Sequence, residues 1–138
     1  MALEAVLWNK IFLAGIIAWA LTQLLKFLIE GIRTKKFSAK TFVLPGGMPS
    51  SHTAAFTAIA SMIYLLEGVS NLFILSVAVT VVIMYDSVTL RRQVGKITKA
   101  LNSKLKAKIS DFSGHTGFQV LIGLIIGIAV AYLVKWII

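Results

Sequence analysis

Long runs of apolar residues, separated by shorter polar segments, dominate the chain. Three of these runs cover residues 5–29, 71–90 and 118–138, and each is close to the roughly 20 residues that a helix needs to cross a bilayer core. A fourth run, residues 53–66, is shorter and crosses only if it includes the polar residues at its ends. The pattern therefore predicts an all-α polytopic membrane protein with about four transmembrane helices, forming a single domain over residues 1–138.

Residues 91–112 follow a different pattern. Their apolar residues recur at steps of three and four, and the positions between them are mostly Lys, Arg, Asn and Ser. This spacing predicts an amphipathic helix with a basic face. Lying flat at the membrane interface, such a helix would bury its apolar stripe and present its lysines to anionic lipid headgroups. The alternative is that the basic segment only sets the topology of the protein.

Composition and charge agree with a membrane protein. Hydrophobic residues make up 58% of the chain and the mean hydropathy is +0.89, which is more apolar than a soluble domain of this length. The net charge is +9, and eleven of the fourteen Lys and Arg residues lie in segments 31–52 and 91–112. The positive-inside rule places both segments in the cytoplasm and both termini outside, in a multi-pass protein of the inner (plasma) membrane. We expect no nucleic-acid partner.

Small residues occur at positions where membrane helices can pack closely. Gly123 and Gly127 have the GxxxG spacing that lets two backbones approach each other in a membrane. From this spacing we predict a homo-oligomer. The alternative is that these glycines reflect only the general frequency of glycine in membrane helices.

Two cations stand near the end of the first apolar run. Lys26 lies inside the run, and Arg33 follows seven residues later, which is two helical turns, so both side chains share one face if the helix continues. Two cations on one face form a site for a doubly charged anion such as a phosphate. The alternative for Lys26 is that it only reaches along the helix to the membrane surface.

The segment GGMPSSHTAAF, residues 46–56, combines an irregular loop with a helix start. A helix N-terminus presents free N–H groups and a partial positive charge, so it binds phosphate readily. Ser50 and Ser51 add hydroxyl donors and are good N-cap residues, and His52 lies in the first turn. A histidine in a membrane helix is often a packing residue, but its place after Pro-Ser-Ser favours a functional role.

A second histidine motif, SGHT with His115, opens the last apolar run, and we expect Ser113 to cap that helix. Before it, the segment MYDSVTLRRQ carries Asp86 and Arg92. Arg92 can direct two N–H groups onto two phosphate oxygens, while Asp86 either orients a basic side chain or only neutralises one. The chain has no cysteine and no His-x3-His spacing, so we expect no metal.

The stretches GGMPSSHTA, MYDSVTLRRQVGK and GHTGFQVLIG resemble the small bacterial "divergent" branch of the type-2 phosphatidic acid phosphatase and vanadium haloperoxidase superfamily. The resemblance covers about residues 5–130. It implies a metal-independent phosphomonoesterase of the acid-phosphatase type, without a cofactor, that forms a phosphohistidine. It gives His115 the role of nucleophile and His52 that of the acid which protonates the leaving oxygen. The phosphate oxygens would be held by Lys26, Arg33 and Arg92, with Ser50 or Ser51.

This sequence departs from the superfamily pattern in ways that affect the expected chemistry. Residues 93–114 separate Arg92 from His115, where the family has a short spacing, and Gln119 occupies the place of an aspartate that orients the imidazole. Either Asp86 or Asp111 replaces that aspartate, or catalysis is slow, or the protein only binds anionic phospholipids. Because SSHT and SGHT are so alike, the reverse assignment of acid and nucleophile also stays open.

The expected orientation narrows the substrate. A site on the cytoplasmic face suits a lipid phosphate of the inner leaflet, and we consider phosphatidylglycerophosphate, phosphatidic acid and prenyl phosphates, in that order. The rival interpretations are a membrane protein that binds anionic lipids without turnover, and a small transporter or channel subunit. The last has least support, because both histidine motifs lie at helix starts rather than at mid-membrane.

Overall fold

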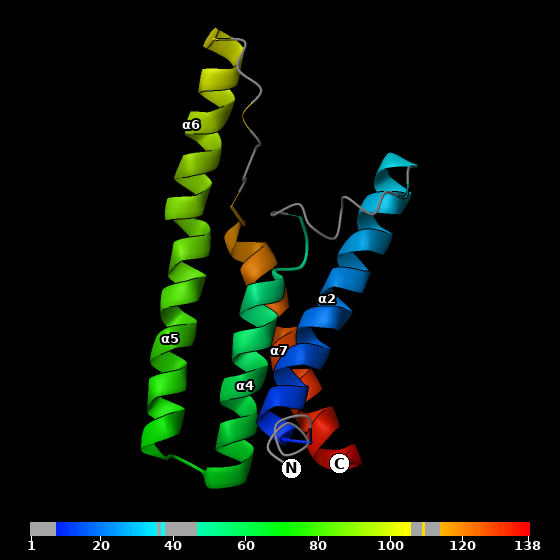
Figure 1. The fold of residues 1–138 in the computed structure, drawn as a ribbon, viewed down its shortest axis with the longest axis vertical. Helices are drawn as coiled ribbons and strands as arrows, with labels where there is room; N and C mark the ends of the chain where they lie inside the picture. Colours follow the sequence, from blue (N-terminus) through cyan, green and yellow to red (C-terminus); the bar gives the residue numbers. More distant parts are fainter. Residues whose placement is uncertain (1–7, 36, 38–46, 106–108, 110–113) are drawn as a thin grey trace.

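The computed structural model describes residues 8–35, 37, 47–105, 109 and 114–138. These residues form helices and no strand, which confirms the predicted all-α class. The helices, labelled in Figure 1, are α2 (Lys10–Thr34), α4 (Ser51–Glu67), α5 (Asn71–Val88), α6 (Leu90–Leu105) and α7 (Gly117–Ile137).

Three of the helical stretches are long and apolar enough to cross a membrane: α2, α7, and α5 taken together with α6. At 17 residues, α4 is about 25 Å long at 1.5 Å per residue, slightly short of a typical bilayer core. The predicted count of about four spans agrees with this arrangement, and α4 is the shortest of the four, as the sequence indicated.

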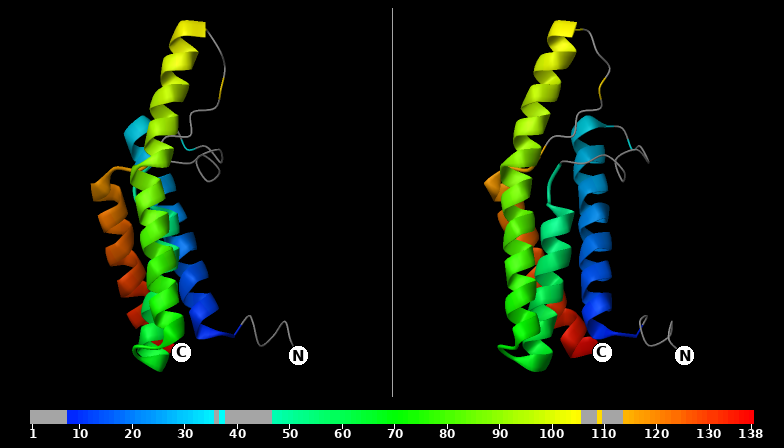
Figure 2. Two further views of the ribbon diagram at one scale, coloured as in Figure 1. Left: turned by 90° about the vertical axis from the view of Figure 1, so that its left-hand side faces the viewer. Right: turned by 60° about the vertical axis from the view of Figure 1, so that its left-hand side comes forward.

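Helix α4 lies at the centre of the bundle. It packs against α2, α5 and α7, and α7 also contacts α2 and α5. Among the described helices, α2 and α5 flank α4 on different sides without contacting each other, as Figures 1 and 2 show. This central position brings the start of α4, which carries His52, next to the helices that carry the other candidate residues.

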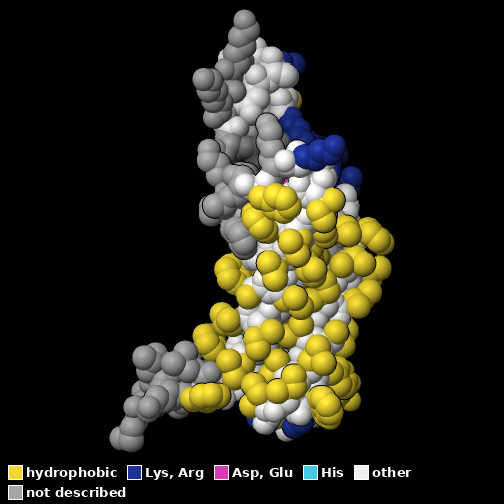
Figure 3. Space-filling view, turned by 90° about the vertical axis from the view of Figure 1, so that its right-hand side faces the viewer, with side chains coloured by type: hydrophobic (Ala, Val, Ile, Leu, Met, Phe, Trp, Pro, Cys, Tyr) yellow, Lys and Arg dark blue, Asp and Glu magenta, His cyan; other side chains and the backbone are white. Residues whose placement is uncertain are grey.

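Small side chains form much of the core of the bundle. Ala14 and Ala18 of α2, Ala54 and Ala58 of α4, and Ala131 of α7 have no exposed surface. Larger apolar side chains point outward and cover the faces of the helices (Figure 3). Because lipid is as apolar as these side chains, helices in a membrane associate through close van der Waals packing, which small residues permit.

The GxxxG pair packs within the chain. A Cβ atom on Gly123 would lie 2.5 Å from the carbonyl oxygen of Ser50, and one on Gly127 would lie 2.5 Å from that of Ala54. No real side chain could occupy either position, so both glycines are required for the contact between α7 and α4. The homo-oligomer therefore stays a prediction, without support from this motif.

Helix α6 is amphipathic, as the pattern predicted, but its direction and its end differ from the prediction. Only Thr89 separates it from α5, and α6 continues nearly in line with α5 and projects beyond the bundle (Figures 1 and 2). No Gly or Pro lies between residues 71 and 94 to turn the chain, so the helix does not lie flat across the end of the bundle. It ends at Leu105, and of the remaining predicted residues 106–112 only Ile109 is described.

The candidate site residues gather at one end of the bundle. Helix α4 begins at this end, close to the junction of α5 and α6 and to the start of α7, whereas α2 begins and α7 ends at the opposite end (Figure 1). A group of Lys and Arg side chains also lies beyond the hydrophobic surface at the site end (Figure 3). The side of the membrane that this end faces stays a prediction.

Candidate active site

His115 is anchored on the junction between α5 and α6. Its backbone N–H donates a hydrogen bond to the carbonyl oxygen of Ser87, at 3.0 Å. The preceding residue, Gly114, packs so closely that a Cβ atom there would overlap the backbone nitrogen of Arg92 and would lie 2.7 Å from the carbonyl carbon of Arg91. Because Gly114 has no side chain, it can pack directly on the backbone of Arg91 and Arg92, although residues 93–113 separate it from these arginines in the sequence.

The His115 ring is held by the first turn of α7. The residue is 9% exposed, and its Nδ1 lies 3.4 Å from Oε1 of Gln119. The same oxygen accepts the backbone N–H of Thr116 at 2.9 Å, which fixes the orientation of the amide. Since Oε1 can only accept, this hydrogen bond requires Nδ1 of His115 to carry the proton, which makes Nε2 the unprotonated nitrogen of the neutral ring.

Thr116 caps α7, where we expected Ser113, a residue outside the described ranges. The Thr116 hydroxyl accepts the backbone N–H of Gln119 at 3.3 Å, and the Gln119 side chain bonds back to Thr116. This reciprocal pair is a capping box, whose signature, Thr or Ser followed three residues later by Gln or Glu, was present in the sequence as TGFQ. Gln119 thus both caps the helix and orients the histidine.

Burial lowers the pKa of His115 below its usual value, because the charged form loses hydration. The hydrogen bonds with Gln119 and with the backbone of Gly47 raise the pKa and so oppose this effect. The charges of Lys26 and His52 lower the pKa further. The ring is therefore neutral near pH 7, which is the form that can act as a nucleophile.

Lys26 connects the two histidines. The residue is 8% exposed, so other residues of the bundle cover its side chain, and its charge acts on both His52 and His115. Gly47 has a positive φ of 82°, and a Cβ atom there would lie 3.0 Å from Cε of Lys26. A side chain at residue 47 would therefore press on the lysine. Glu30, one turn further along α2, also interacts with Lys26.

His52 lies in the first turn of α4 with an exposed side chain. It interacts electrostatically with Arg91, with Lys26 and with His115. The two histidines, which come from opposite halves of the sequence, thus lie within electrostatic reach of each other and of the same lysine.

The two serines before His52 are buried. Ser50 occupies the N-cap position of α4, but its hydroxyl forms no capping bond and instead lies 2.9 Å from the hydroxyl of Thr53. Its backbone N–H donates to the Gln119 carbonyl at 3.2 Å, which ties the start of α4 to the start of α7. Ser51 is 7% exposed. Both serines therefore help to build the end of the bundle.

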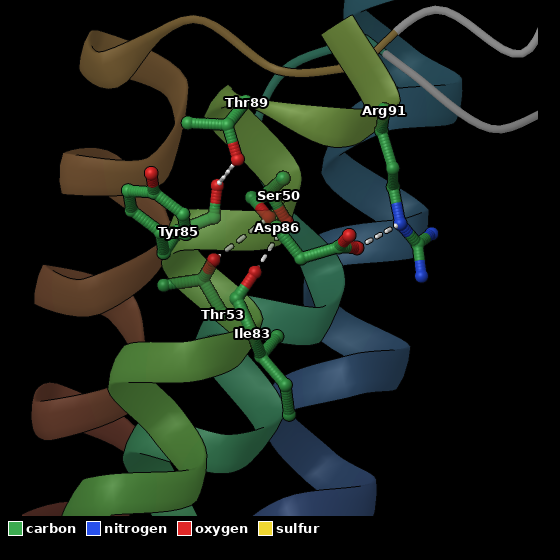
Figure 4. A network of polar contacts seen from close by, with 8 residues as sticks. Ser50, Thr53, Ile83, Tyr85, Asp86, Thr89 and Arg91 are labelled. Carbon is green, nitrogen blue, oxygen red and sulfur yellow. Dashed lines mark hydrogen bonds and ion pairs between the residues drawn. The ribbon is translucent and has the colours of Figure 1, made fainter. Parts of the chain in front are cut away.

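Arg91, rather than Arg92, interacts with His52. Its Nε lies 2.7 Å from Oδ2 of Asp86 (Figure 4), so Asp86 orients a basic side chain, which is one of its two expected roles. Asp86 is not the hydrogen-bond partner of His115, because Gln119 takes that place, and Asp111 lies outside the described residues. The sequence analysis did not single out Arg91, since nothing in the pair RR shows which member faces the histidine.

Arg33 is separated from this group. It lies in the last turn of α2 with 79% of its side chain exposed, and its Nη1 is 3.9 Å from Oε2 of Glu30. Two helical turns place it about 10 Å from Lys26 along the helix axis. Among the described residues its ion-pair partner is Glu30 of the same helix, not a group beside either histidine. Within the described ranges, no three His, Cys, Asp or Glu side chains gather as metal ligands would.

A family model described as the "Divergent PAP2 family" matches residues 7–130. The chain belongs to the Divergent PAP2 family. The match confirms the resemblance stated from the three motifs. The chain is also 28% identical, over 144 aligned positions, to the "Uncharacterized membrane protein YuiD" of Bacillus subtilis (strain 168), covering 88% of this chain and 91% of that protein. No solved structure matches the chain.

In this member of the Divergent PAP2 family, the structure brings together a buried neutral imidazole, a more exposed imidazole, and the cations Lys26 and Arg91. Cations of this kind stabilise the negative charge of a phosphate, and more so where water is partly excluded. Neutral and protonated imidazoles can act as nucleophile and as acid. The arrangement therefore has the groups that phosphoryl transfer requires.

Proposed function

We propose that the protein is an integral membrane lipid phosphatase, which hydrolyses a lipid phosphomonoester through a phosphohistidine intermediate. The main support is that His52 and His115 lie within electrostatic reach of each other and of Lys26. A bound phosphate between these groups would be in contact with a nucleophile, an acid and a cation at once. Membership of the Divergent PAP2 family is consistent with this chemistry.

In the first step, Nε2 of His115 attacks the phosphorus atom and forms a P–N bond. The P–O bond to the lipid breaks, and the leaving oxygen takes a proton from His52. In the second step, water attacks the phosphohistidine, His52 accepts a proton from that water, and the P–N bond breaks to release inorganic phosphate. Atoms and charges balance over the cycle, and both rings return to their starting forms.

Two observations support His115, rather than His52, as the nucleophile. The His115 ring is buried and its Nδ1 is held by Gln119, so its Nε2 has a fixed direction, and fixed geometry favours attack. His52 is exposed, so it can exchange protons with water between the two steps. A bound phosphate dianion would also favour the protonated form of this ring.

Lys26 and Arg91 would hold the phosphate oxygens in this scheme. The family resemblance assigns that role to Arg92 and Arg33 as well, and we retain both as proposed phosphate ligands, together with Ser50 and Ser51. Arg91 is an addition from the structure, because it interacts with His52 and is oriented by Asp86. The end of the bundle where α4 and α7 begin (Figure 1) is also the end where Lys and Arg side chains lie beyond the hydrophobic surface (Figure 3), and there a lipid phosphate would meet water.

For the substrate we propose a lipid phosphate of the cytoplasmic leaflet of the inner membrane: phosphatidylglycerophosphate first, then phosphatidic acid, then a prenyl phosphate. The choice of a cytoplasmic-leaflet lipid rests on the positive-inside orientation, in which the basic segments around Arg33 and after Arg91 face the cytoplasm and both termini lie outside.

The test is release of inorganic phosphate by the purified protein in detergent from each of these three lipids, with and without vanadate. We expect release from at least one lipid, inhibition by vanadate, and a loss of about 10³-fold or more in the His115→Ala variant. Lys135→Ala, at the opposite end of α7, is the matched control and should keep full activity. Full activity of His115→Ala, with folding confirmed by its melting temperature, would remove His115 as the nucleophile.

One observation favours a second function, the binding of anionic phospholipids without turnover. The partner of His115 is the neutral Gln119, and in a serine protease the comparable change from carboxylate to amide lowers kcat by about 10⁴. A binding protein of this kind would retain lipid phosphates on a lipid-overlay or flotation assay, would release no phosphate, and would bind equally well as His115→Gln.

A further inference from the structure

Helix α6 carries an apolar stripe that no other described helix covers. The stripe consists of Leu90, Val94, Ile97 and Leu101, which recur at steps of four, three and four residues and are between 39% and 65% exposed. Among the described helices, α6 contacts only α5. Contiguous exposed apolar side chains of this kind indicate a surface that binds a partner.

The direction of α6 carries the apolar stripe away from the lipid. Helix α5 has 18 residues, so it is about 27 Å long at 1.5 Å per residue, close to the roughly 30 Å of a bilayer core. Helix α6 continues nearly in line with α5 (Figures 1 and 2), and its 16 residues extend about 24 Å further. With α5 across the core, acyl chains therefore do not cover Ile97 and Leu101.

The spacing of the apolar stripe is that of a coiled coil. Alternating steps of four and three residues are the d-to-a and a-to-d steps of a heptad, with Leu90 and Ile97 at d and with Val94 and Leu101 at a. Two helices with such a stripe bury it by packing the stripes against each other. The helix in its observed direction can do this without a bend at Thr89, whereas contact with the membrane surface would require one.

A neighbouring face of α6 is already occupied, and the apolar stripe lies clear of it. Gly95, Thr98 and Asn102 each follow a residue of the stripe by one position, so they lie about 100° around the helix from it. Gly95 and Thr98 are buried, and Asn102 forms two hydrogen bonds with the backbone of Ile109, at 2.9 and 3.0 Å. The stripe itself is the face that stays open to a partner.

The cations of α6 lie mostly outside the surface that two such helices would share. The helix has five cations and no carboxylate. Three of the cations occupy the outer heptad positions c and f: Arg92, Lys96 and Lys99. Arg91, at position e, has its Nε 2.7 Å from Oδ2 of Asp86. Lys104 follows at the next d position and ends the stripe.

The positions that flank the stripe would not repel each other in a parallel pair. In such a pair, the g residue of one helix lies near the e residue of the next heptad of the other helix. These pairs are Gln93 with Thr98 and Ala100 with Leu105, and none of these side chains is charged. The charge pattern therefore permits pairing of two copies of α6 and directs the cations outward to water.

We propose that α6 pairs with α6 of a second copy of this chain, as a parallel two-stranded coiled coil along the apolar stripe. Copies inserted in the same orientation project α6 on the same side of the membrane, so the two helices are parallel and in register. A helix pair this short is weak on its own in water, but the membrane anchors raise the effective concentration of the two helices. The pairing does not rest on the proposed phosphatase function.

The pairing is tested by disulfide cross-linking of single cysteines, because the natural chain has none. In isolated membranes of an expressing host, Leu101→Cys places a thiol in the stripe, where it faces the same thiol of the second copy. Ser103→Cys is the matched control, since it lies at nearly the same height but about 200° around the helix, and its hydroxyl bonds only within α6. Under oxidant, we expect Leu101→Cys to cross-link about tenfold faster or more.

Salt and a charge in the stripe separate pairing from the alternatives. Salt screens the repulsion between the cations of two copies, so cross-linking of Leu101→Cys should increase with salt, whereas adhesion of α6 to an anionic membrane surface would weaken. Adding Ile97→Lys should lower the rate to that of Ser103→Cys, and adding Lys99→Ala should not. Equal rates for Leu101→Cys and Ser103→Cys, a rate that falls with salt, or a rate that Ile97→Lys leaves unchanged would overturn the proposal.

Discussion

The side-chain oxygen of Gln119 lies 3.4 Å from Nδ1 of His115 while it also accepts the N–H of Thr116. One neutral side chain thus caps α7 and orients the ring that we propose as nucleophile. In this arrangement the ring has a defined tautomer but no negative charge beside it. The reactivity of the site therefore depends on how well an amide replaces a carboxylate.

The first prediction concerns this amide. Glu at the third position of a helix also completes a capping box, so Gln119→Glu should keep the cap and add a charge beside His115. The charge should raise the pKa of the ring and increase kcat by about tenfold or more, with the 10⁴ of a serine protease as the upper limit. Gln119→Leu removes both roles and should lower activity and stability together. Steady-state kinetics and melting temperatures of the two variants distinguish these outcomes; a lower kcat in a stable Gln119→Glu protein would contradict the prediction.

The second prediction is a pH dependence. Burial lowers the pKa of His115 in the folded protein, so the unfolded chain binds a proton more readily, and stability rises with pH wherever the two states differ. The contribution of this ring to stability is therefore complete above about pH 6.5, the usual pKa of histidine, and is lost as pH falls through the lower folded value. Melting temperatures measured from pH 8 to pH 5 should decline below about pH 6.5, and the decline should be smaller in His115→Gln. An equal decline in both proteins would contradict this assignment.

The third prediction concerns the docking of the segment before α7. Gly114→Ala places a methyl group against the backbone of Arg91 and Arg92, and overpacking of this kind costs about 1–3 kcal/mol. We expect a lower melting temperature and a loss of phosphate release, because His115 moves with Gly114. Gly117→Ala is the matched control, since nothing lies within 4 Å of a Cβ atom there. A Gly114→Ala protein as active and stable as Gly117→Ala would show that the segment does not dock as described.

The fourth prediction separates the two adjacent arginines. Arg91 interacts with His52 and is held by Asp86, so Arg91→Gln should raise KM for the lipid phosphate by about tenfold or more, the effect of losing one charge-assisted contact. Asp86→Asn should produce a smaller change in the same direction, because it frees the arginine. Arg92→Gln provides the comparison. If Arg92→Gln has the larger effect, then Arg92, as the family resemblance implies, and not Arg91, as the observed geometry indicates, holds the bound phosphate.

Much of this arrangement could be predicted from single residues and their spacing. Lys26 lies in an apolar run, where a charged residue is costly and therefore indicates a functional position. In the structure it is buried, and its charge acts on both histidines. His52 and His115 each opened a helix, and the structure places them at one end of the bundle. Gly123 and Gly127 signalled close packing, and the contact exists, although its partner is α4 of the same chain.

The remainder depends on contacts between distant segments. Adjacent residues on a helix point about 100° apart, so the choice between Arg91 and Arg92 depends on how the chain passes Thr89, which carries no breaking signal. The direction of α6 depends on the same residue. Nor could the sequence show that Gly114 packs on the arginine backbone, because a glycine marks a close approach without naming its partner. The capping role of Gln119 is readable from TGFQ, whereas the family resemblance points only to its other role, as a replacement for aspartate.

The central claim is that His52 and His115 share one phosphate between them, with His115 as the nucleophile. Its most direct test is to incubate the protein with a ³²P-labelled lipid phosphomonoester, quench the reaction in alkali, where phosphohistidine survives, and locate the label by peptide mapping. We predict label on the peptide that contains His115, no label in His115→Ala, and slower labelling in His52→Ala. Label that persists in His115→Ala, or phosphate release with label on no histidine, would contradict the account.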